Sequence, residues 1–213
     1  MKFTKWQGTG NDFVIVNGFE ETIVDYSAKA IELCDRHFGI GADGLILVLP
    51  SAIADFRMRI FNSDGGEAEM CGNGIRCFAR YVYENGLLDK TELSVETLAG
   101  IIRPKLLPAD GKETLVCVDM GEPRLKRGEI PMTGEPAGRV IDVPLVVGGA
   151  DYRITCVSMG NPHCVIFTDA VEELDLPTLG RPIEGHPWFP RKTNVEFVQV
   201  LDRQNLRMRV WER

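Results

Sequence analysis

One cysteine lies where a thiol could take part in catalysis. The run Asn62-Ser-Asp-Gly-Gly-Glu-Ala-Glu-Met-Cys-Gly-Asn-Gly-Ile-Arg-Cys77 follows a predicted strand and places Cys71 immediately before a predicted helix. The backbone amides of Gly72 and Asn73 would point out of the first helical turn, where they could bind a carboxylate or a phosphate. The positive end of the helix dipole also lowers the pKa of a thiol, which favours a reactive thiolate at Cys71. Glycine at positions 72 and 74 would let the backbone approach a ligand closely.

The other cysteines fit packing roles better. Helical or strand-like runs contain Cys34, Cys77, Cys117, Cys156 and Cys164. Cys77 follows Cys71 closely enough to be considered as a resolving thiol, so a thiol redox protein is one alternative. Cys71 could itself be a buried packing residue, because cysteine is among the most often buried residue types. The chain has no Cys-x-x-Cys pair and no His/Cys ligand spacing, so we expect no metal site.

Polar residues elsewhere could hold a ligand. Asn11 and Asn161 each follow a glycine and precede an apolar strand, where a short amide could bind substrate or simply form a turn. His163 could tune or orient a thiolate, and Arg213 could pair with a substrate carboxylate, although both residue types are more often structural or solvated. The run Gly8-Thr-Gly-Asn-Asp12 lacks the third glycine of a dinucleotide fingerprint and precedes a strand instead of following one.

The chain contains an internal repeat. Gly10-Asn11 recurs as Gly160-Asn161, and Arg57-Met-Arg-Ile-Phe61 recurs as Arg207-Met-Arg-Val-Trp211, both at an offset of 150 residues. At this offset, Arg213 corresponds to Ser63, and a counterpart of Cys71 is expected at position 221. We therefore expect one complete half in residues 1–116 and a second half in residues 117–213 that stops before its own cysteine and helix.

The predicted elements alternate between strands and a few helices. Buried or half-buried strands are expected at Phe13–Val16, Leu45–Leu49, Phe56–Phe61, Leu115–Val118, Val140–Val143 and Tyr152–Val157. One helix is expected from an N-cap at Ser27 to about Phe38, with Ile31, Cys34 and Phe38 as its apolar stripe. A second should begin near Gly74, bury Ile75, Phe78, Ala79 and Val82, and end at Asn85-Gly86. Pro108-Ala-Asp-Gly111 is typical of a hairpin turn.

Composition excludes several classes of protein. The 213 residues carry a formal net charge of -7, which argues against a surface for nucleic acid or anionic membranes. No apolar run is long enough to span a bilayer, and the N-terminus has no signal-peptide pattern. We expect a cytoplasmic protein with reduced thiols.

Taken together, these motifs resemble the diaminopimelate epimerase family. The resemblance rests on the runs Gly8-Thr-Gly-Asn-Asp-Phe13, Phe61-Asn-Ser-Asp-Gly65, Glu69-Met-Cys-Gly-Asn-Gly-Ile-Arg-Cys77, Gly160-Asn-Pro-His-Cys164, Thr193-Asn-Val-Glu-Phe197 and Arg209-Val-Trp-Glu-Arg213. It implies interconversion of LL- and meso-diaminopimelate for lysine and peptidoglycan synthesis, without pyridoxal phosphate or metal. It also implies an α/β (α+β) fold of two pseudo-symmetric halves, each a curved mixed sheet wrapped on a central helix, with the active site between them.

The resemblance assigns a role to each matching residue. Cys71 matches the first of two catalytic cysteines, one from each half, that serve as base and acid on opposite faces of the α-carbon. The amides of Gly72 and Asn73 match donors to the carboxylate at the reacting centre. Substrate-holding positions match Asn11, Asn62, Asn161, Asn194 and Arg213. His163 and Glu212 match residues that adjust the thiol pKa values. The expected partner is a small amino-acid substrate, and a homodimer is left open.

Two departures from the family pattern matter. Gly44 stands where many members have glutamine, so that contact to the substrate is absent or replaced. The second Cys-Gly-Thr-Gly segment and the second central helix are not in the chain, so a truncated, non-catalytic form that binds diaminopimelate is the main alternative. A proline-racemase-like or phenazine-pathway isomerase would share the fold but should lack the Met-Cys-Gly-Asn-Gly-Ile-Arg-Cys run.

Overall fold

The computed structural model describes residues 1–107 and 115–212, which belong to two compact units, Met1–Met120 and Gly121–Arg213. The expected turn at Pro108–Gly111 and the terminal Arg213 lie outside the described residues. The boundary between the units falls later than the expected end of the first half at residue 116. The reason is that β9 (Leu115–Val118) pairs antiparallel with β8 (Pro104–Leu107) and so remains part of the first unit.

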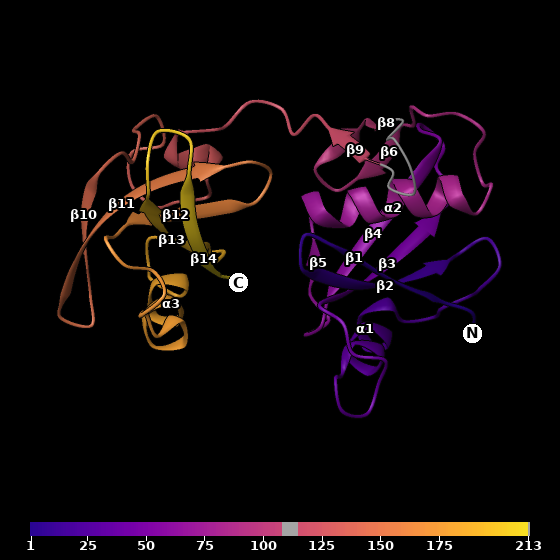
Figure 1. Cartoon of the computed structure of the whole chain (residues 1–213), viewed down its shortest axis with the longest axis horizontal. Helices are drawn as coiled ribbons and strands as arrows, with labels where there is room; N and C mark the ends of the chain where they lie inside the picture. The colour runs from indigo at the N-terminus through magenta and orange to yellow at the C-terminus, as the bar shows by residue number, and fades with distance from the viewer. Residues whose placement is uncertain (108–114, 213) are drawn as a thin grey trace. The chain divides into compact units, whose positions relative to one another are not determined.

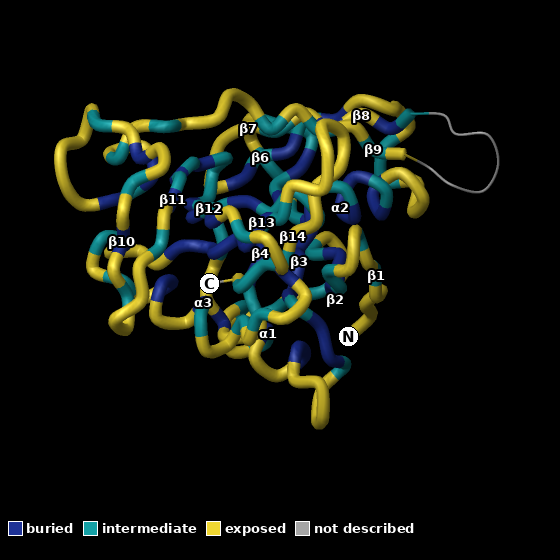
Figure 2. Tube along the Cα trace, turned by 60° about the vertical axis from the view of Figure 1, so that its left-hand side comes forward, coloured by how far each residue is buried: buried dark blue, intermediate teal, exposed yellow. Residues whose placement is uncertain are grey.

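The first unit contains a mixed sheet with a helix on each face (Figure 1). The strand order is β1-β2-β3-β4-β6-β7, with β5 beside β4, and the pairs β2–β3 and β4–β6 are parallel. The elements are β1 (Thr4–Gly8), β2 (Asn11–Asn17), α1 (Tyr26–Cys34), β3 (Gly44–Leu49), β4 (Phe56–Asn62), β5 (Glu67–Ala68), α2 (Gly72–Glu84), β6 (Val95–Thr97) and β7 (Gly100–Ile102). The central strands β2 and β3 are buried on both faces, as their continuous apolar runs predict (Figure 2).

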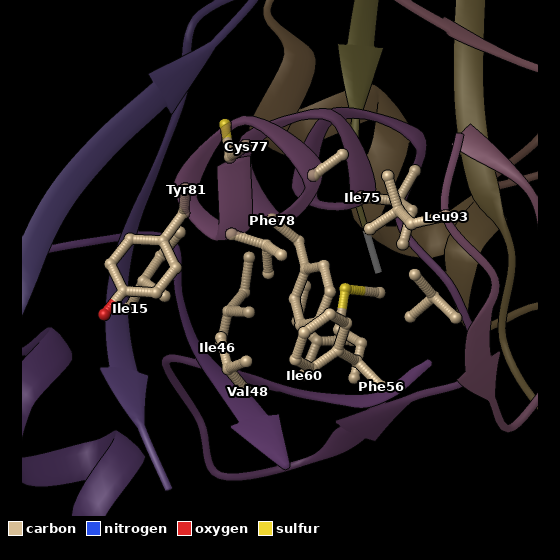
Figure 3. Packing of buried hydrophobic residues seen from close by; sticks show 14 of the residues in the cluster. Ile15, Ile46, Val48, Phe56, Ile60, Ile75, Cys77, Phe78, Tyr81 and Leu93 are labelled. Carbon is tan, nitrogen blue, oxygen red and sulfur yellow. The ribbon is translucent and has the colours of Figure 1, made fainter. Parts of the chain in front are cut away.

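Helix α2 is the central helix of this unit. Its predicted apolar stripe is confirmed, since Ile75, Phe78, Ala79 and Val82 are all buried. These side chains pack against Ile15, Ile46, Phe56 and Ile60 of the sheet (Figure 3), and the β8–β9 hairpin also contacts the helix. Asn85 caps the C-terminus and Gly86 follows with φ +65°, which glycine adopts without strain.

Helix α1 differs from the prediction at both ends. Its N-cap is Asp25, whose carboxylate accepts a hydrogen bond from the Ala28 amide at 3.0 Å, and not Ser27. The helix ends at Cys34 because the Asp35 side chain accepts from the next amides, including that of Phe38 at 2.7 Å. Phe38 is therefore 96% exposed, and the buried stripe consists of Ala30, Leu33 and Cys34.

The second unit contains a sheet of order β10-β11-β12-β13-β14 with one face packed on α3 (Leu176–Glu184). Its strands are β10 (Val143–Val147), β11 (Ala150–Ser158), β12 (Pro162–Phe167), β13 (Asn194–Val200) and β14 (Leu206–Trp211), and a short 3-10 helix, η1, spans Arg127–Glu129. The strand expected at Val140–Val143 is wrong: Asp142 has φ +53°, so β10 begins only at Val143. The packed face includes Ile154, Cys164 and Phe197.

The internal repeat is present in the three-dimensional structure at the same offset of 150 residues. The parallel pair Phe13↔Gly44 recurs as His163↔Asn194, and the antiparallel pair Leu45↔Phe61 recurs as Val195↔Trp211. Helix α3 occupies the positions that correspond to α1, although we did not predict it. The two units are therefore pseudo-symmetric over β2–β4 and β12–β14.

The unit-two face that corresponds to the α2 side of the first sheet carries exposed apolar side chains. Phe167 is 61% exposed and Met208 is 55% exposed, whereas the α2 side of the first sheet is a closed core. Among the described residues, α3 packs on the other face of this sheet, where Ile183 and Phe197 share one core cluster.

Candidate active site

Cys71 is the N-cap of α2. Its backbone is extended, with φ −138° and ψ 118°, while its carbonyl accepts the first helical hydrogen bond from the Ile75 amide at 2.9 Å. Its Sγ accepts a hydrogen bond from the Gly74 amide at 3.3 Å. A donor aimed at the sulfur, at the positive end of a helix, stabilises negative charge there. The Cys71 residue is half-buried, unlike Cys34, Cys77, Cys156 and Cys164, which are buried.

Two backbone amides accompany this thiol. The first amides of a helix have no partner within the helix, and those of Gly74 and Ile75 are taken by Cys71. Within residues 1–107 and 115–212, the backbone amides of Gly72 and Asn73 donate no hydrogen bond. These are the two amides that we expected to bind a carboxylate. The helix terminus therefore offers a thiol and two donors in one turn.

Gly72 and Gly74 have different roles. A Cβ on Gly72 would lie 3.6 Å from Cε of Met120, an ordinary contact, so this position leaves the backbone accessible. A Cβ on Gly74 would lie 3.2 Å from the Cδ1 atoms of both Ile46 and Ile60. The expectation that Gly74 admits a ligand is thus wrong: Gly74 faces the sheet, and its missing side chain lets α2 pack closely on β3 and β4.

A chain of side-chain hydrogen bonds holds the polar residues next to the thiol. The Asn73 side-chain amide donates to Oδ1 of Asn11 at 2.6 Å, and the Asn11 amide donates to Asp43 at 3.1 Å. Arg76 donates to Oδ1 of Asn73 and to Thr9. Asn11, which we predicted as a substrate-binding residue, is therefore fixed in orientation against the first turn of α2.

An ion network supports the start of β2. The guanidinium of Arg36 lies 2.8 Å from one Asp12 oxygen, and the ammonium of Lys5 lies 3.0 Å from the other. The hydrogen bond from Arg36 holds the pKa of the Asp12 carboxyl well below its usual range, against the opposing effect of burial. Arg36 also pairs with Asp43 at 2.7 Å, so the residue that orients Asn11 is itself anchored.

Asn62 and Gly44 lie opposite each other in the sheet, at the end of β4 and the start of β3. The Asn62 carbonyl accepts from the Gly65 amide at 2.9 Å, which starts the turn toward Cys71. A Cβ on Gly44 would lie 2.9 Å from the Phe61 carbonyl oxygen. A glutamine at this position would therefore force the β3 and β4 backbones to shift. The close strand spacing seen here is possible because residue 44 is glycine.

The other cysteines are poor candidates for chemistry. Burial raises the pKa of the Cys77 thiol to about 11, and nearby Cys71 adds to the increase. Burial likewise raises the pKa of Cys34 to about 11. A hydrogen bond with Cys156, together with burial, raises the pKa of Cys164. Cys71 and Cys77 are six positions apart, which is about 9 Å along the helix axis and too far for a disulfide without unwinding α2.

The second unit assembles a polar cluster of its own at the start of β12. His163 Nδ1 lies 2.6 Å from Oε1 of Glu196, and His163 Nε2 lies 3.0 Å from Oδ1 of Asn161. Asn194 is buried and pairs in register with His163. Glu212 is exposed and follows β14, and Arg213 lies outside the described residues. Of the residues predicted in this unit, Asn161, His163 and Asn194 thus lie together at the start of β12 and β13.

Two residues that hold predicted site residues were given no role by sequence reasoning. Asp43 accepts a hydrogen bond from Asn11, and Glu196, which lies within the run Thr193-Asn-Val-Glu-Phe197, contacts His163. For Glu196, one signal was available: a single carboxylate interrupts the otherwise apolar, buried run Val195–Val198. Buried carboxylates generally have a specific partner.

The described residues contain neither a metal-binding cluster nor a membrane-spanning helix. No group of three or more His, Cys, Asp or Glu side chains suited to a metal ion occurs in the described part of the chain. No helix found there has the length and apolar character needed to cross a membrane.

Comparison with solved structures identifies the fold. A probable proline racemase from Agrobacterium radiobacter matches 99% of this chain and 70% of its own, with TM-score 0.69 and 13% identity. A hydroxyproline epimerase from Agrobacterium vitis matches 99% and 69%, with TM-score 0.67 and 15% identity. A phenazine biosynthesis protein of the PhzF family from Bacillus anthracis matches 100% and 73%, with TM-score 0.65 and 20% identity. At these identities the likeness concerns the fold alone.

Comparison with curated sequences identifies the family. The diaminopimelate epimerase of Moorella thermoacetica is 60% identical over the whole of this chain and 76% of its own length. That of Pelotomaculum thermopropionicum is 59% identical with the same coverage. The family model for diaminopimelate epimerase matches residues 3–126 and 155–213. Together with the cysteine at the N-terminus of α2, these matches show that the chain belongs to the diaminopimelate epimerase family.

Proposed function

We propose that this protein interconverts LL- and meso-diaminopimelate by moving the α-proton, without a cofactor. The observation that carries the proposal is the first turn of α2, where the Cys71 sulfur and the amides of Gly72 and Asn73 lie together. The names and identities of the relatives point to the same substrate.

In one direction, the Cys71 thiolate removes the α-proton: the C–H bond breaks, an S–H bond forms, and the electron pair remains on the substrate. The charge spreads into the adjacent carboxylate, which the two amides would stabilise as it develops. A thiol on the opposite face then donates its proton to the α-carbon, which inverts the centre. In the reverse direction the two sulfurs exchange roles.

The opposing thiol is expected from the repeat at position 221, beyond the residues of this sequence. The polar cluster of Asn161, His163 and Asn194 would hold the substrate and adjust the thiols, in the roles that the family resemblance implies. Asn11 is already fixed by its bonds to Asn73 and Asp43, so it would bind with little loss of side-chain freedom.

The test is exchange of the α-proton of diaminopimelate in deuterated water, followed by NMR. We expect exchange with the wild-type protein and a loss of at least about 100-fold with Cys71→Ala, since the base is removed. Cys117→Ser is the matched control, because Cys117 is exposed on β9 and should leave the rate unchanged. Binding in calorimetry without exchange would favour the non-catalytic alternative, and neither binding nor exchange would refute both.

A further inference from the structure

Glu196 is a buried carboxylate on β13 that the proposed mechanism does not yet use. Its side chain is 8% exposed, and its strand neighbours Val195 and Phe197 belong to the apolar core. Oε1 lies 2.6 Å from His163 Nδ1, while Oε2 is buried and has no hydrogen-bond partner in the described part of the chain. Burying a carboxylate is costly unless it is paired, so the contact with His163 accounts for its presence.

The fold itself does not require a carboxylate at this position. The repeat offset of 150 residues aligns Glu196 with Ile46, as the register pairs Phe13↔Gly44 and His163↔Asn194 show. Ile46 is fully buried in the equivalent strand and packs under α2. The sheet can therefore form with an apolar residue at this position. We attribute the carboxylate of Glu196 to its contact with His163 and not to a requirement of the fold.

Glu196 determines which ring nitrogen of His163 carries a proton. The carboxylate can only accept, so Nδ1 carries a hydrogen and donates it. Nε2 is then left to interact with the side-chain amide of Asn161 at 3.0 Å. A neutral ring accepts from the Asn161 NH2 group, and a charged ring donates to its carbonyl oxygen. In both cases the ring decides which end of the amide points away from it.

We propose that Glu196 is a positioning residue that acts through His163 on Asn161. It fixes the Nδ1–H form of the ring, so that Nε2 faces Asn161 and its protonation alone sets which end of the Asn161 amide faces the substrate. The inference rests on the proposed function, because Asn161 is a substrate-holding residue only in that reaction. The ligand class is an amino acid, whose carboxylate or ammonium group would meet the outward end of the amide.

A double-mutant cycle of Glu196→Gln and His163→Gln tests the connection. We expect Glu196→Gln to lower kcat/KM for α-proton exchange by about 10- to 100-fold, as for other residues that orient a reacting or binding group. In the His163→Gln background, Glu196→Gln should change kcat/KM by less than about twofold, because residues that act as a unit are not additive. If the loss of kcat/KM in the double variant equals the product of the losses in the two single variants, the proposal is overturned.

Glu196→Ile separates positioning from packing, since it copies Ile46 of the first unit. We expect Tm to stay unchanged or rise, because an apolar residue replaces a buried charge, while exchange falls at least as far as with Glu196→Gln. Retained exchange with Glu196→Ile would show that the carboxylate only fills space. Glu173→Gln, at an exposed site of the same unit, is the control and should alter neither measurement.

Nitrogen-15 NMR of labelled histidine and asparagine tests the same contact without turnover. The wild type should show a hydrogen-bonded Nδ1–H on His163, and Glu196→Ile should lose it and shift the Asn161 side-chain amide signals. Unchanged signals would overturn the positioning role even if the protein is an active epimerase. If the signals change as expected but wild type shows no exchange, the proposed function fails and the Glu196–His163–Asn161 linkage stands.

Discussion

The two units use one backbone pattern with different side chains on the same face of the sheet. In the first unit, Ile46 and Met58 lie under α2 in a closed core. The corresponding positions in the second unit are Glu196, which binds His163, and Met208, which is 55% exposed. The opposite faces agree much more closely, since α1 and α3 occupy equivalent positions. Backbone pairing is thus preserved between the halves, while the chemistry of one face has diverged.

The largest expected difference in stability concerns the two methionines. Met58 is 2% exposed, so Met58→Ala should lower the free energy of unfolding by about 2–5 kcal/mol through lost packing and a cavity. Met208→Ala should change it by no more than about 0.5 kcal/mol, as at other surface positions. Urea unfolding of both variants measures the difference. Equal losses would contradict the assignment of Met208 to an exposed face and indicate that a partner covers it.

A second pair compares the helices on the shared face. Ala30 of α1 lies in one cluster with Phe61, and the equivalent positions in the second unit are Gly180 and Trp211. A Cβ on Gly180 would lie 2.4 Å from Cγ of Trp211. The second unit therefore pairs a larger aromatic ring with a glycine, where the first unit pairs Phe61 with an alanine. Gly180→Ala should therefore cost about 1–3 kcal/mol through overpacking.

Combining Gly180→Ala with Trp211→Phe should recover about 1 kcal/mol relative to the sum of the two single losses, because it restores the pair found in the first unit. Recovery would remain partial, since the Trp211 ring nitrogen also donates to Glu184 at 2.8 Å. Additive losses in urea unfolding would mean that the two residues do not compensate each other.

The smallest expected effect concerns how the stability of each unit changes at low pH. Asp12 has its pKa lowered by the Arg36 hydrogen bond, and its counterpart in the second unit is Pro162. A carboxyl with a depressed folded-state pKa stabilises the fold above the unfolded value of about 4, and this stabilisation is lost as the pH falls below it. Asp12→Asn should thus make unfolding stability less dependent on pH below about 4.

Urea unfolding from pH 7 down to pH 2 measures that dependence, with Asp89→Asn at an exposed site as control. If Asp12→Asn and wild type lose stability in parallel below pH 4, the ion network at the start of β2 does not stabilise the first unit.

Local signals in the sequence predicted the central helix well and the peripheral helix poorly. The stripe of α2 and its Asn85-Gly86 end are correct, because a long apolar face and a glycine cap act within a few residues. In α1, both Asp25 and Ser27 are residue types that can cap a helix. Asp25 is the N-cap, because the Ser27 hydroxyl donates instead to the Gly65 carbonyl at 2.8 Å. That contact joins distant segments, so no window of sequence contains it.

By itself, the sequence determined the repeat, the position of Cys71 before a helix and the family to which the chain belongs, since each is recorded in residue order and spacing. Only the tertiary structure decided how the site side chains are held. The Asn73–Asn11–Asp43 chain and the Glu196–His163–Asn161 cluster join strands and helices that are far apart in sequence. Hydrogen bonds of this kind depend on strand register and side-chain direction, which become defined only when the sheets form.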